Sequence, residues 1–560
     1  MVGSSLAAVY LISAPLVMLL VTAFRGPDDF LPFEPGAHWS LEHLRAVYGD
    51  AVLYSVTVPD TLLFVGGSVV LTFVTAFALA WLVERTDLPL RNVLFTLLLF
   101  PLLVPSVVLA IAWIYLLGPN AGWINVALRS IVRVEHGGPF DVFSLPGLIV
   151  CQSAALVPFV FLLLTATLRT MNPALEEASS TAGAGPWTTF WRVTIPVLRP
   201  GLLAPLILAA LVTLEQFEMP LMLGVPARVS VFSTRIFYEL NPDSGLPIYG
   251  RAAAVALPFL LIALLLLAVY NRLTTRADHY VTVTGRGYRA RRFPLGRWRW
   301  PALAASAAYV GLTSVLPALV LLWISLAGYR TPSIESLGEL SLDAYGSVLA
   351  SSTFLLAAKN TFIAAATSAA LVTAIGTVLA WMLVRTTMRG RGLLDAVSFI
   401  SIGIPSVIAG LAAMVLYLSV PLPVYGTVWI LVLAYSYRLA VTTRLSRAGL
   451  LQLHPELEEA SFTAGARWLT TFRRIVLPLL SPALVAGFVL LFIIGFREFT
   501  LPMVLSSADN VVLSVMLWRL FEDGRAAEAA SVATAIIVLV VPVIFVVRRI
   551  VLRDVERAAC

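Results

Sequence analysis

Charged side chains are scarce in this sequence of 560 residues. Only 12% of the residues are Asp, Glu, Lys or Arg, whereas 59% are hydrophobic, and the mean hydropathy is +0.91. Soluble globular chains carry about 25% charged residues. The composition therefore excludes an ordinary soluble domain and indicates a chain that folds in lipid.

Cysteine and lysine are nearly absent. Cys151 lies inside an apolar run and Cys560 is the last residue, so a disulfide framework or a cysteine-ligated metal site is excluded. The single lysine, Lys359, follows two alanines, whereas an ATP-binding P-loop needs lysine in a Gly-Lys-Ser/Thr sequence. We therefore expect that this chain is not an ATP-hydrolysing enzyme and that any energy comes from another chain.

Long apolar runs dominate what remains. Charge-free runs of about 18 or more residues predict transmembrane helices. Clear runs cover 4–24, 61–83, 93–118, 142–168, 252–270, 301–328, 361–384, 396–420 and 530–547. Three others, which end in polar residues, cover 201–223, 424–437 and 483–505. The first run has no basic leader or cleavage site before it, which favours a retained helix. We expect an all-α polytopic membrane protein with about twelve transmembrane helices.

The basic residues are concentrated in segments that the predicted topology places on the cytoplasmic side. Segment 271–300 holds eight arginines and one acidic residue, and short Arg-rich loops stay cytoplasmic. Threading the spans from there places 176–197, 458–479 and the tail 548–560 on the same inner side. The net charge of +7 is thus a sign of topology, and we expect no nucleic-acid partner.

The chain also repeats itself. A shift of 300 positions aligns Asp60 and Thr61 with Asn360 and Thr361, and a shift of 282 aligns 176–200 with 458–482, where 15 of 25 positions are identical. Each half then holds six spans, so the halves run parallel about a pseudo-twofold axis along the membrane normal. We expect a first half at 1–270, a basic cytoplasmic linker at 271–300 and a second half at 301–560.

The repeated segment is polar although it lies between apolar spans. Acidic residues stand where they favour a helix start, and Gly183 and Gly465 stand where a left-handed residue would end that helix. A second amphipathic segment with Arg192, or with Arg473 and Arg474, follows. The pattern predicts a short helix, a glycine turn and a second helix on the cytoplasmic face. It fits either an interfacial linker between spans or a docking surface for two copies of a partner.

The same segment resembles a known motif. Glu459, Ala460, Ser461 and Gly465, followed by Ile-Val-Leu-Pro at 475–478, are similar to the EAA motif of permease subunits in binding-protein-dependent ABC importers. The first copy has Glu177, Ala178, Ser179 and Gly183, followed by Val-Thr-Ile-Pro at 193–196, at the same spacing. Over its whole length the chain resembles fused, two-halved type I permeases of the ferric-iron kind.

The resemblance implies which proteins the chain binds and in which membrane it lies. The EAA region would be a coupling helix that docks on a cytoplasmic ATPase, with one ATPase copy for each half. The coupling residues implied are Glu176, Glu177, Ala178 and Gly183, and Glu458, Glu459, Ala460 and Gly465. ATP and magnesium would belong to the ATPases, and this chain would hold no cofactor. A substrate-binding protein would meet the outer face, and the chain would lie in the bacterial cytoplasmic (inner) membrane.

Ionisable residues inside a span usually face a cavity or a partner, because burying charge in lipid is costly. The fifth span of each half breaks its apolar run at matched positions, in one half at Glu215, Gln216 and Glu218, and in the other at Arg497 and Glu498. These residues predict a pore lining or gate, or alternatively a structural ion pair between Glu215 and Arg497. Arg438, Tyr435, Tyr437 and Gln152 are weaker candidates, either for this role or for packing.

The sequence is compatible with more than one transported substrate and with more than one class of membrane protein. Oxygen ligands suit ferric iron, but a metal site is not evident, and thiamine, phosphonate, sugar phosphate or a polyamine fits the same machinery. A twelve-helix secondary transporter would not need the repeated loop. A membrane enzyme would need clustered catalytic groups, whereas the five histidines lie in loops. We expect the permease of an ATP-driven importer, with ferric iron as its cargo.

Overall fold

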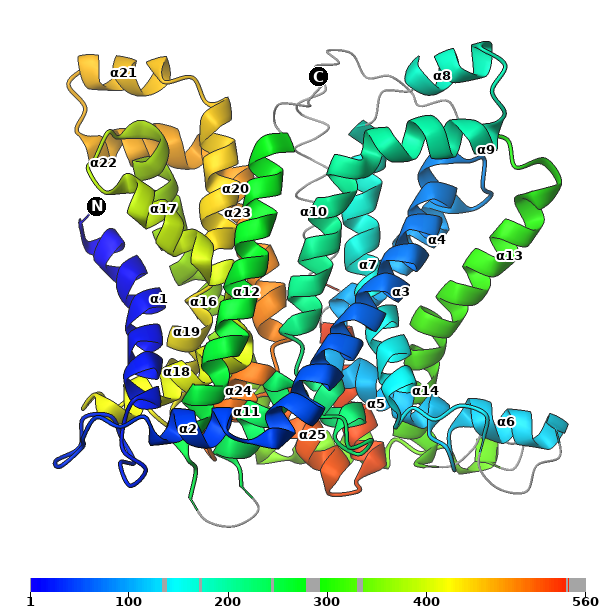
Figure 1. Cartoon of the computed structure of the whole chain (residues 1–560), viewed down its shortest axis with the longest axis horizontal. Helices are drawn as coiled ribbons and strands as arrows, with labels where there is room; N and C mark the ends of the chain where they lie inside the picture. Colours follow the sequence, from blue (N-terminus) through cyan, green and yellow to red (C-terminus); the bar gives the residue numbers. More distant parts are fainter. Residues whose placement is uncertain are drawn as a thin grey trace. The chain divides into compact units, whose positions relative to one another are not determined.

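The computed structural model describes residues 2–132, 138–170, 174–242, 246–277, 293–329, 336–539 and 542 (Figure 1). Apart from two isolated bridges, every regular element in these ranges is a helix, which confirms the all-α fold. Half of the predicted linker at 271–300, namely 278–292, lies outside the described ranges, and the tail at 548–560 lies wholly outside them.

Within the described residues, seven helical stretches are long and apolar enough to cross a membrane, and the number rises to ten if each of three bent pairs is one span. The seven are Gly3–Ala23, Leu53–Arg85, Leu145–Arg169, Tyr249–Leu273, Gly296–Ala327, Ser352–Arg385 and Trp468–Phe496. The bent pairs are Arg91–Leu103 with Ser106–Leu117, Trp187–Arg199 with Gly201–Leu214, and Arg391–Gly403 with Ser406–Ser419. A multi-pass membrane protein is therefore confirmed.

The span count is below the twelve expected from the sequence for a local reason. The predicted span at 424–437 holds only the short helix α19, and the one at 530–547 is described as the apolar helix Ala526–Leu539. Helix α19 is shorter than the about 20 residues that a bilayer core requires, and most of 540–547 lies outside the described residues.

The chain forms two compact units. One consists of the described residues of Ala51–Arg235 and Leu261–Leu340. Its helices are α3 (Val58–Arg85), α4 (Arg91–Leu98), α5 (Ser106–Leu117), α6 (Trp123–Val132), α7 (Leu145–Thr170), α8 (Ala174–Thr181), α9 (Pro186–Thr189), α10 (Ile195–Leu214), α13 (Arg299–Val310) and α14 (Leu316–Ala327). We call it the α3 unit.

The other, the α16 unit, consists of the described residues of Met1–Asp50, Ile236–Leu260 and Ser341–Cys560. Its helices are α1 (Val2–Ala23), α2 (Glu42–Tyr48), α15 (Asp343–Ala350), α16 (Ser352–Arg385), α17 (Arg391–Ile400), α18 (Ser406–Ser419), α19 (Val428–Tyr435), α20 (Leu439–Gln452), α21 (Glu456–Thr463), α22 (Trp468–Thr471), α23 (Leu477–Phe496), α24 (Thr500–Val504) and α25 (Leu513–Glu522). Helices α11 (Phe232–Leu240) and α12 (Tyr249–Ala277) have residues in both units.

The units are not the two contiguous halves of the sequence. Helix α1 packs against α17 and α18 of the second half, and α13 and α14 pack against α4 and α5 of the first. The first helix of each half thus belongs to the compact unit built mainly from the other half. The division at 1–270, 271–300 and 301–560 stays a prediction about the sequence repeat.

Helices α3 and α7 form the centre of the α3 unit and run parallel. The Ser153 hydroxyl donates to the Ser68 carbonyl at 3.2 Å, and Arg169 binds both carboxylate oxygens of Glu84 at 2.7 and 3.0 Å. Both contacts join residues 85 positions apart, so the two helices keep one register along their length. Buried apolar side chains fill the space between them.

Helices α16 and α20 repeat that arrangement in the α16 unit. The Thr442 hydroxyl donates to the Val372 carbonyl at 3.0 Å, and one turn later Thr377 and Ser446 are 3.4 Å apart. A Cβ added at Gly376 would lie 2.3 Å from Thr442 Oγ1. Only glycine allows this close approach, as is common where membrane helices pack.

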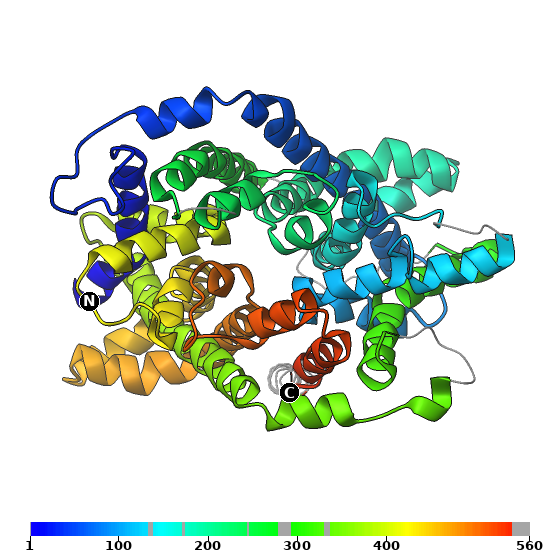
Figure 2. The ribbon, with the colours of Figure 1, turned by 90° about the horizontal axis from the view of Figure 1, so that it is seen from below.

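The first half has an insertion between its third and fourth predicted spans, at 118–147. It carries α6, drawn in cyan in Figure 2. The Trp123 ring of α6 meets Trp323 of α14, in the same unit, at 6.2 Å. The buried Asn125 side chain donates to the carbonyls of Leu117, Gly118 and Phe140 and accepts from the Phe140 amide. This one amide holds the insertion together.

Candidate functional site

The first copy of the repeated loop is a short helix that ends at a glycine. Helix α8 is followed by Gly183, whose φ is +83°. The Ala184 amide donates to the Ser179 carbonyl and the Gly183 amide to the Ser180 carbonyl. This is a Schellman cap, which glycine permits because it has no Cβ to strain the left-handed backbone. Helix α9 follows and continues through a π-helical turn at Phe190–Thr194 into α10.

The second copy has the same backbone. Helix α21 ends at Gly465 with φ +82°, and the Ala466 amide donates to the Ser461 carbonyl. Helix α22 passes through a π-helical turn at Phe472–Val476 into α23. The predicted helix, glycine turn and second helix are confirmed in both copies. In Figure 1, α8 and α21 each lie beyond the ends of the long helices of their own unit.

Proline explains the π-helical turns. Pro196 and Pro478 stand two residues after the last residue of each turn and have no amide hydrogen to continue the normal ladder. In each copy the amide of the residue before the proline reaches five positions back instead, from Ile195 to Phe190 and from Leu477 to Phe472. In the second copy the loop therefore continues into the membrane helix as one stretch, Trp468–Phe496, whereas in the first copy the stretch bends by 64° between Arg199 and Gly201.

The first glutamate of each copy faces its own chain. Glu176 and Glu458 are 6% and 7% exposed. Arg85, the last residue of α3, donates to Glu176, and Arg385, the last residue of α16, donates to Glu458 at 2.8 Å. We call these two contacts the anchor pairs. The resemblance counted both glutamates among the residues that couple the chain to the ATPases, and that assignment stays a prediction.

Each carboxylate has a second donor, and the donor differs between copies. The Thr194 hydroxyl donates to Glu176 at 2.7 Å, whereas the Trp381 indole donates to Glu458 at 2.9 Å. The position equivalent to Thr194 in the second copy is Val476. Both carboxylates are thus held by two side-chain donors, through different residues.

The remaining predicted coupling residues are more accessible. Ala178 and Gly183 are exposed in the first copy, where Glu177 is half-buried. Glu459, Ala460 and Gly465 are exposed in the second. This exposed face of α8 and α21 is open to a partner, although contact with one is a prediction.

Two further contacts fix the loop on its membrane helix. The hydroxyls of Ser179 and Thr189 are 2.9 Å apart, and those of Ser461 and Thr471 are 2.8 Å apart. Trp81 of α3 meets Phe190 edge to face at 4.9 Å, and Trp381 of α16 meets Trp468 at 5.3 Å. In each copy, hydroxyls join the two short helices and aromatic rings hold them against α3 or α16.

The predicted pore residues lie where two membrane helices break. Helix α10 ends at Leu214 and α23 at Phe496, directly before Glu215 and Arg497. A broken helix leaves carbonyl groups without partners. In the first half the Ser233 hydroxyl donates to the Gln216 carbonyl, and in the second the Ser514 hydroxyl donates to the Glu498 carbonyl, each at 2.7 Å.

The matched residues 60–61 and 360–361 of the sequence repeat stabilise the segments that follow these breaks. Thr61 accepts from the Phe232 amide at the start of α11, and Thr361 accepts from the Leu513 amide at the start of α25. Asp60 accepts from the Ser230 amide, and Asn360 donates to two carbonyls before α25. The matched pairs at 60–61 and 360–361 therefore hold the short helices that follow each break.

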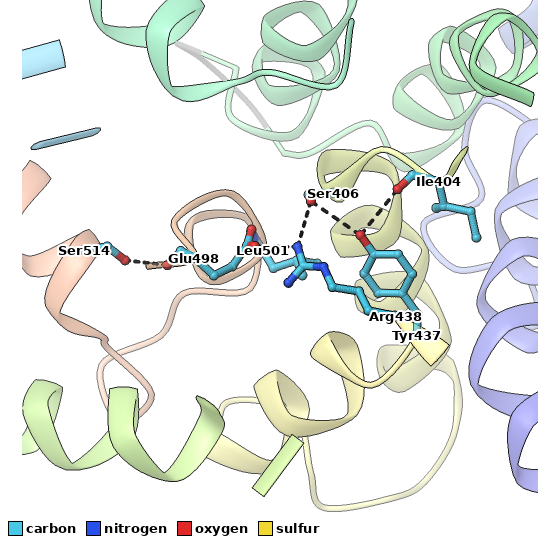
Figure 3. Close-up of polar contacts among 7 residues, drawn as sticks. All are labelled: Ile404, Ser406, Tyr437, Arg438, Glu498, Leu501 and Ser514. Atoms are coloured by element: carbon cyan, nitrogen blue, oxygen red, sulfur yellow. Dashed lines mark hydrogen bonds and ion pairs between the residues drawn. The ribbon is translucent and has the colours of Figure 1, made fainter. Parts of the chain in front are cut away.

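Arg438 and Glu498 form an ion pair that sequence reasoning did not find. Arg438 lies between α19 and α20, and its guanidinium donates to the Glu498 carboxylate and to the Ser406 hydroxyl (Figure 3). The two side chains are 14% and 9% exposed. An arginine inside an apolar run needs a counter-ion, and Glu498 is an acidic residue inside another apolar run of the same half.

The other candidate residues inside the predicted spans differ in burial and in hydrogen bonding. Glu215, Gln216, Glu218 and Arg497 are half-buried. Glu215 belongs to the α3 unit and Arg497 to the α16 unit, so their pairing stays a prediction. Gln152 and Tyr435 are buried, and Tyr437 donates to the Ile404 carbonyl. Among the described residues, no group of three or more His, Cys, Asp or Glu side chains is placed to hold a metal ion.

Comparisons with known proteins agree with the duplicated loop. A family model described as "Binding-protein-dependent transport system inner membrane component" matches residues 74–279 and 372–556, once in each half. The ferric transport system permease protein FbpB of Actinobacillus pleuropneumoniae is 25% identical over 96% of this chain and 75% of its own length. A putative FbpB of Haemophilus influenzae is 26% identical over 90% and 77%.

Among solved structures, a bacterial ABC transporter involved in the import of the acidic polysaccharide alginate aligns over 46% of this chain and 96% of its own, with 18% identity. Its TM-score of 0.36 is too low to add to the fold described above. The two matches of the family model cover most of the chain, one in each half. The chain therefore belongs to the binding-protein-dependent transport system inner membrane components, and is a multi-pass permease of an ABC importer in the inner membrane.

Proposed function

We propose that this importer permease carries ferric iron and that each copy of the loop docks one subunit of a cytoplasmic ATPase. The observation that carries the docking proposal is the duplicated loop itself. Two segments 282 residues apart share the same helix, glycine cap, hydroxyl contact and anchor pair. Lipid contact alone would not require such agreement in polar detail, whereas two copies of one partner would.

The exposed face of the loop suits this partner. Ala178 and Ala460 leave room for close approach, and Glu459 offers a charge at the surface. The chain's single lysine is Lys359 in α16, outside any Gly-Lys-Ser/Thr sequence. In this proposal ATP and magnesium bind on the ATPases, and the permease itself holds no cofactor.

The proposal of ferric iron rests on the relatives that span both halves. Three ferric transport permeases match 96%, 90% and 68% of this chain. A sulfate permease and a diacetylchitobiose permease match only 39% and 47% of it. A binding protein on the outer face would deliver the iron, because permeases of this family act with such proteins.

The pathway residues proposed are Glu215, Gln216, Glu218, Arg497 and Glu498. They stand at the breaks of α10 and α23. Broken helices at depth in a membrane are tolerated where they line a cavity or are buried in protein. Carboxylate oxygens at such a break suit a hard cation in transit.

The test is reconstitution. The permease would be placed in proteoliposomes with the ATPase and binding protein encoded beside it, and ATP-dependent uptake of radioactive iron would be measured. Iron uptake that needs all three components is expected. Uptake of sulfate, thiamine, phosphonate or a polyamine in place of iron would overturn the cargo, and uptake without any ATPase would favour a secondary transporter.

A further inference from the structure

The proposed function counts the anchor pairs as part of the repeat but gives them no role of their own. Glu176 and Glu458 are buried, whereas Ala178 and Ala460, two residues later, are exposed. On a helix, residues three apart share a face, and Ser179 and Ser461 accordingly face the same way, toward Thr189 and Thr471. The first glutamate of each copy therefore belongs to the inner face of the loop.

The arginine of each pair is part of a long membrane helix. Arg85 is 1% exposed and ends α3, and Arg385 ends α16. The Arg385 guanidinium also donates to the carbonyls of Leu450 and Leu453 at the end of α20. One half-buried cation thus joins α16, α20 and the short helix α21. Charge-assisted bonds of this kind are strong and geometrically specific.

The N-terminal parts of α3 and α16 contact the short helices α11 and α25, which follow the breaks in the chain. Thr61 lies 24 residues before Arg85, and Thr361 lies 24 residues before Arg385. At a rise of 1.5 Å per residue this spans about 36 Å, more than the apolar core of a bilayer. Thr61 holds the start of α11 and Thr361 the start of α25. The serines that follow, Ser233 and Ser514, bind the carbonyls at the breaks.

We propose that Glu176 and Glu458 are positioning residues that do not contact the ATPase. Each fixes the docking helix to the end of α3 or α16, so that movement of α8 or α21 shifts the whole long helix and, through Thr61 or Thr361, the helix break. This inference rests on the proposed docking function. It is supported by duplication, because both copies keep the ion pair while the second donor changes from Thr194 to Trp381.

The test separates binding of the ATPase from coupling. Glu458→Gln removes the buried charge with little change in shape, and Glu459→Gln changes the exposed neighbour. For each variant, reconstituted with the ATPase and binding protein, one would measure ATPase affinity, ATP hydrolysis and solute uptake per ATP. We expect E458Q to keep its ATPase affinity and lose about ten-fold or more in uptake per ATP, and E459Q to lose affinity.

A second variant guards against misfolding. Arg385→Lys keeps a cation in the buried site, but a lysine cannot reach Glu458 and two carbonyls together in the planar geometry of arginine. The same loss of coupling is expected, and Thr194→Val, which installs the residue of the other copy, should weaken coupling less.

The outcomes distinguish failure of the positioning role from failure of the proposed docking function. Uptake per ATP that is unchanged in both E458Q and R385K would overturn the positioning role. So would E458Q losing ATPase affinity as E459Q does, because Glu458 would then be a contact residue. A wild-type chain that binds no ATPase would overturn the proposed function as well.

Discussion

Arg438 and Glu498 form a largely buried ion pair, with side chains 14% and 9% exposed, although 60 residues separate them in sequence. One stands at the break between α19 and α20 and the other at the break between α23 and α24. The positions equivalent to them in the first half, after the shift of 282, are Leu156 and Gln216. The second half therefore joins two broken helices by charge where the first half has no charge at either place.

Replacing Glu498 by Ala leaves the Arg438 guanidinium buried without its counter-ion. We expect a loss of about 3–5 kcal/mol in stability, as is typical when one partner of a buried pair is removed. The double change of Arg438→Met with Glu498→Leu should recover most of it, because neither charge is then left unpaired. The thermal unfolding midpoint in detergent measures both. A single variant as stable as the wild type would show that the pair is not buried.

The two glycines of the first loop offer a matched comparison. Gly183 has φ +83°, whereas Gly185 lacks a positive φ, and a Cβ at either would meet no atom within 4 Å. Gly183→Ala should therefore cost about 1–2 kcal/mol of local stability through backbone strain alone. Gly185→Ala should be close to neutral. Amide hydrogen exchange at Ala184, whose amide closes the cap, reports the difference, and equal exchange in the two variants would contradict it.

Ser514→Ala removes the donor to the Glu498 carbonyl at the break of α23. We expect a loss of about 1–3 kcal/mol, since a partly buried carbonyl loses its hydrogen-bond donor. Ser347→Ala, at an exposed position of α15, is the control and should change little. The readout is again the unfolding midpoint, and a shift in the control as large as in the test variant would refute this account.

His43 makes the loop after α1 sensitive to acid. Burial, and also the charge of Arg251, lower the pKa of His43 below its usual value of 6.5, although its hydrogen bond to the Gly26 carbonyl and the acids Glu42 and Asp29 act in the opposite direction. With the folded pKa depressed, its contribution to stability is complete above pH 6.5 and is lost as pH falls through the folded pKa.

The expected result is a lower unfolding midpoint at pH 5 than at pH 7.5, with a smaller difference in His43→Gln. This substitution keeps a hydrogen-bond donor near Gly26 and cannot take up a proton in this range. His454, which is exposed in the second loop copy, provides a control: His454→Gln should keep the full dependence on pH. An unchanged dependence in His43→Gln would assign the effect to other groups.

The sequence by itself determined the class of the protein and the form of its repeated loop. Scarce charge and long apolar runs are enough for a polytopic helical fold, because the cost of burying polar backbone in lipid leaves few alternatives. The glycine caps at Gly183 and Gly465 were also predictable, since a left-handed residue after a short polar helix is a local property.

Only the tertiary structure decided where the charged residues point. Glu176 and Glu177 are neighbours in sequence, and an eight-residue helix has no apolar stripe long enough to fix which one faces inward. That was decided by Arg85, 91 residues earlier. In the same way, only the packing of α19, α20 and α23 brings Arg438 to Glu498. Pairings across such separations depend on how helices pack, which local pattern and composition do not encode.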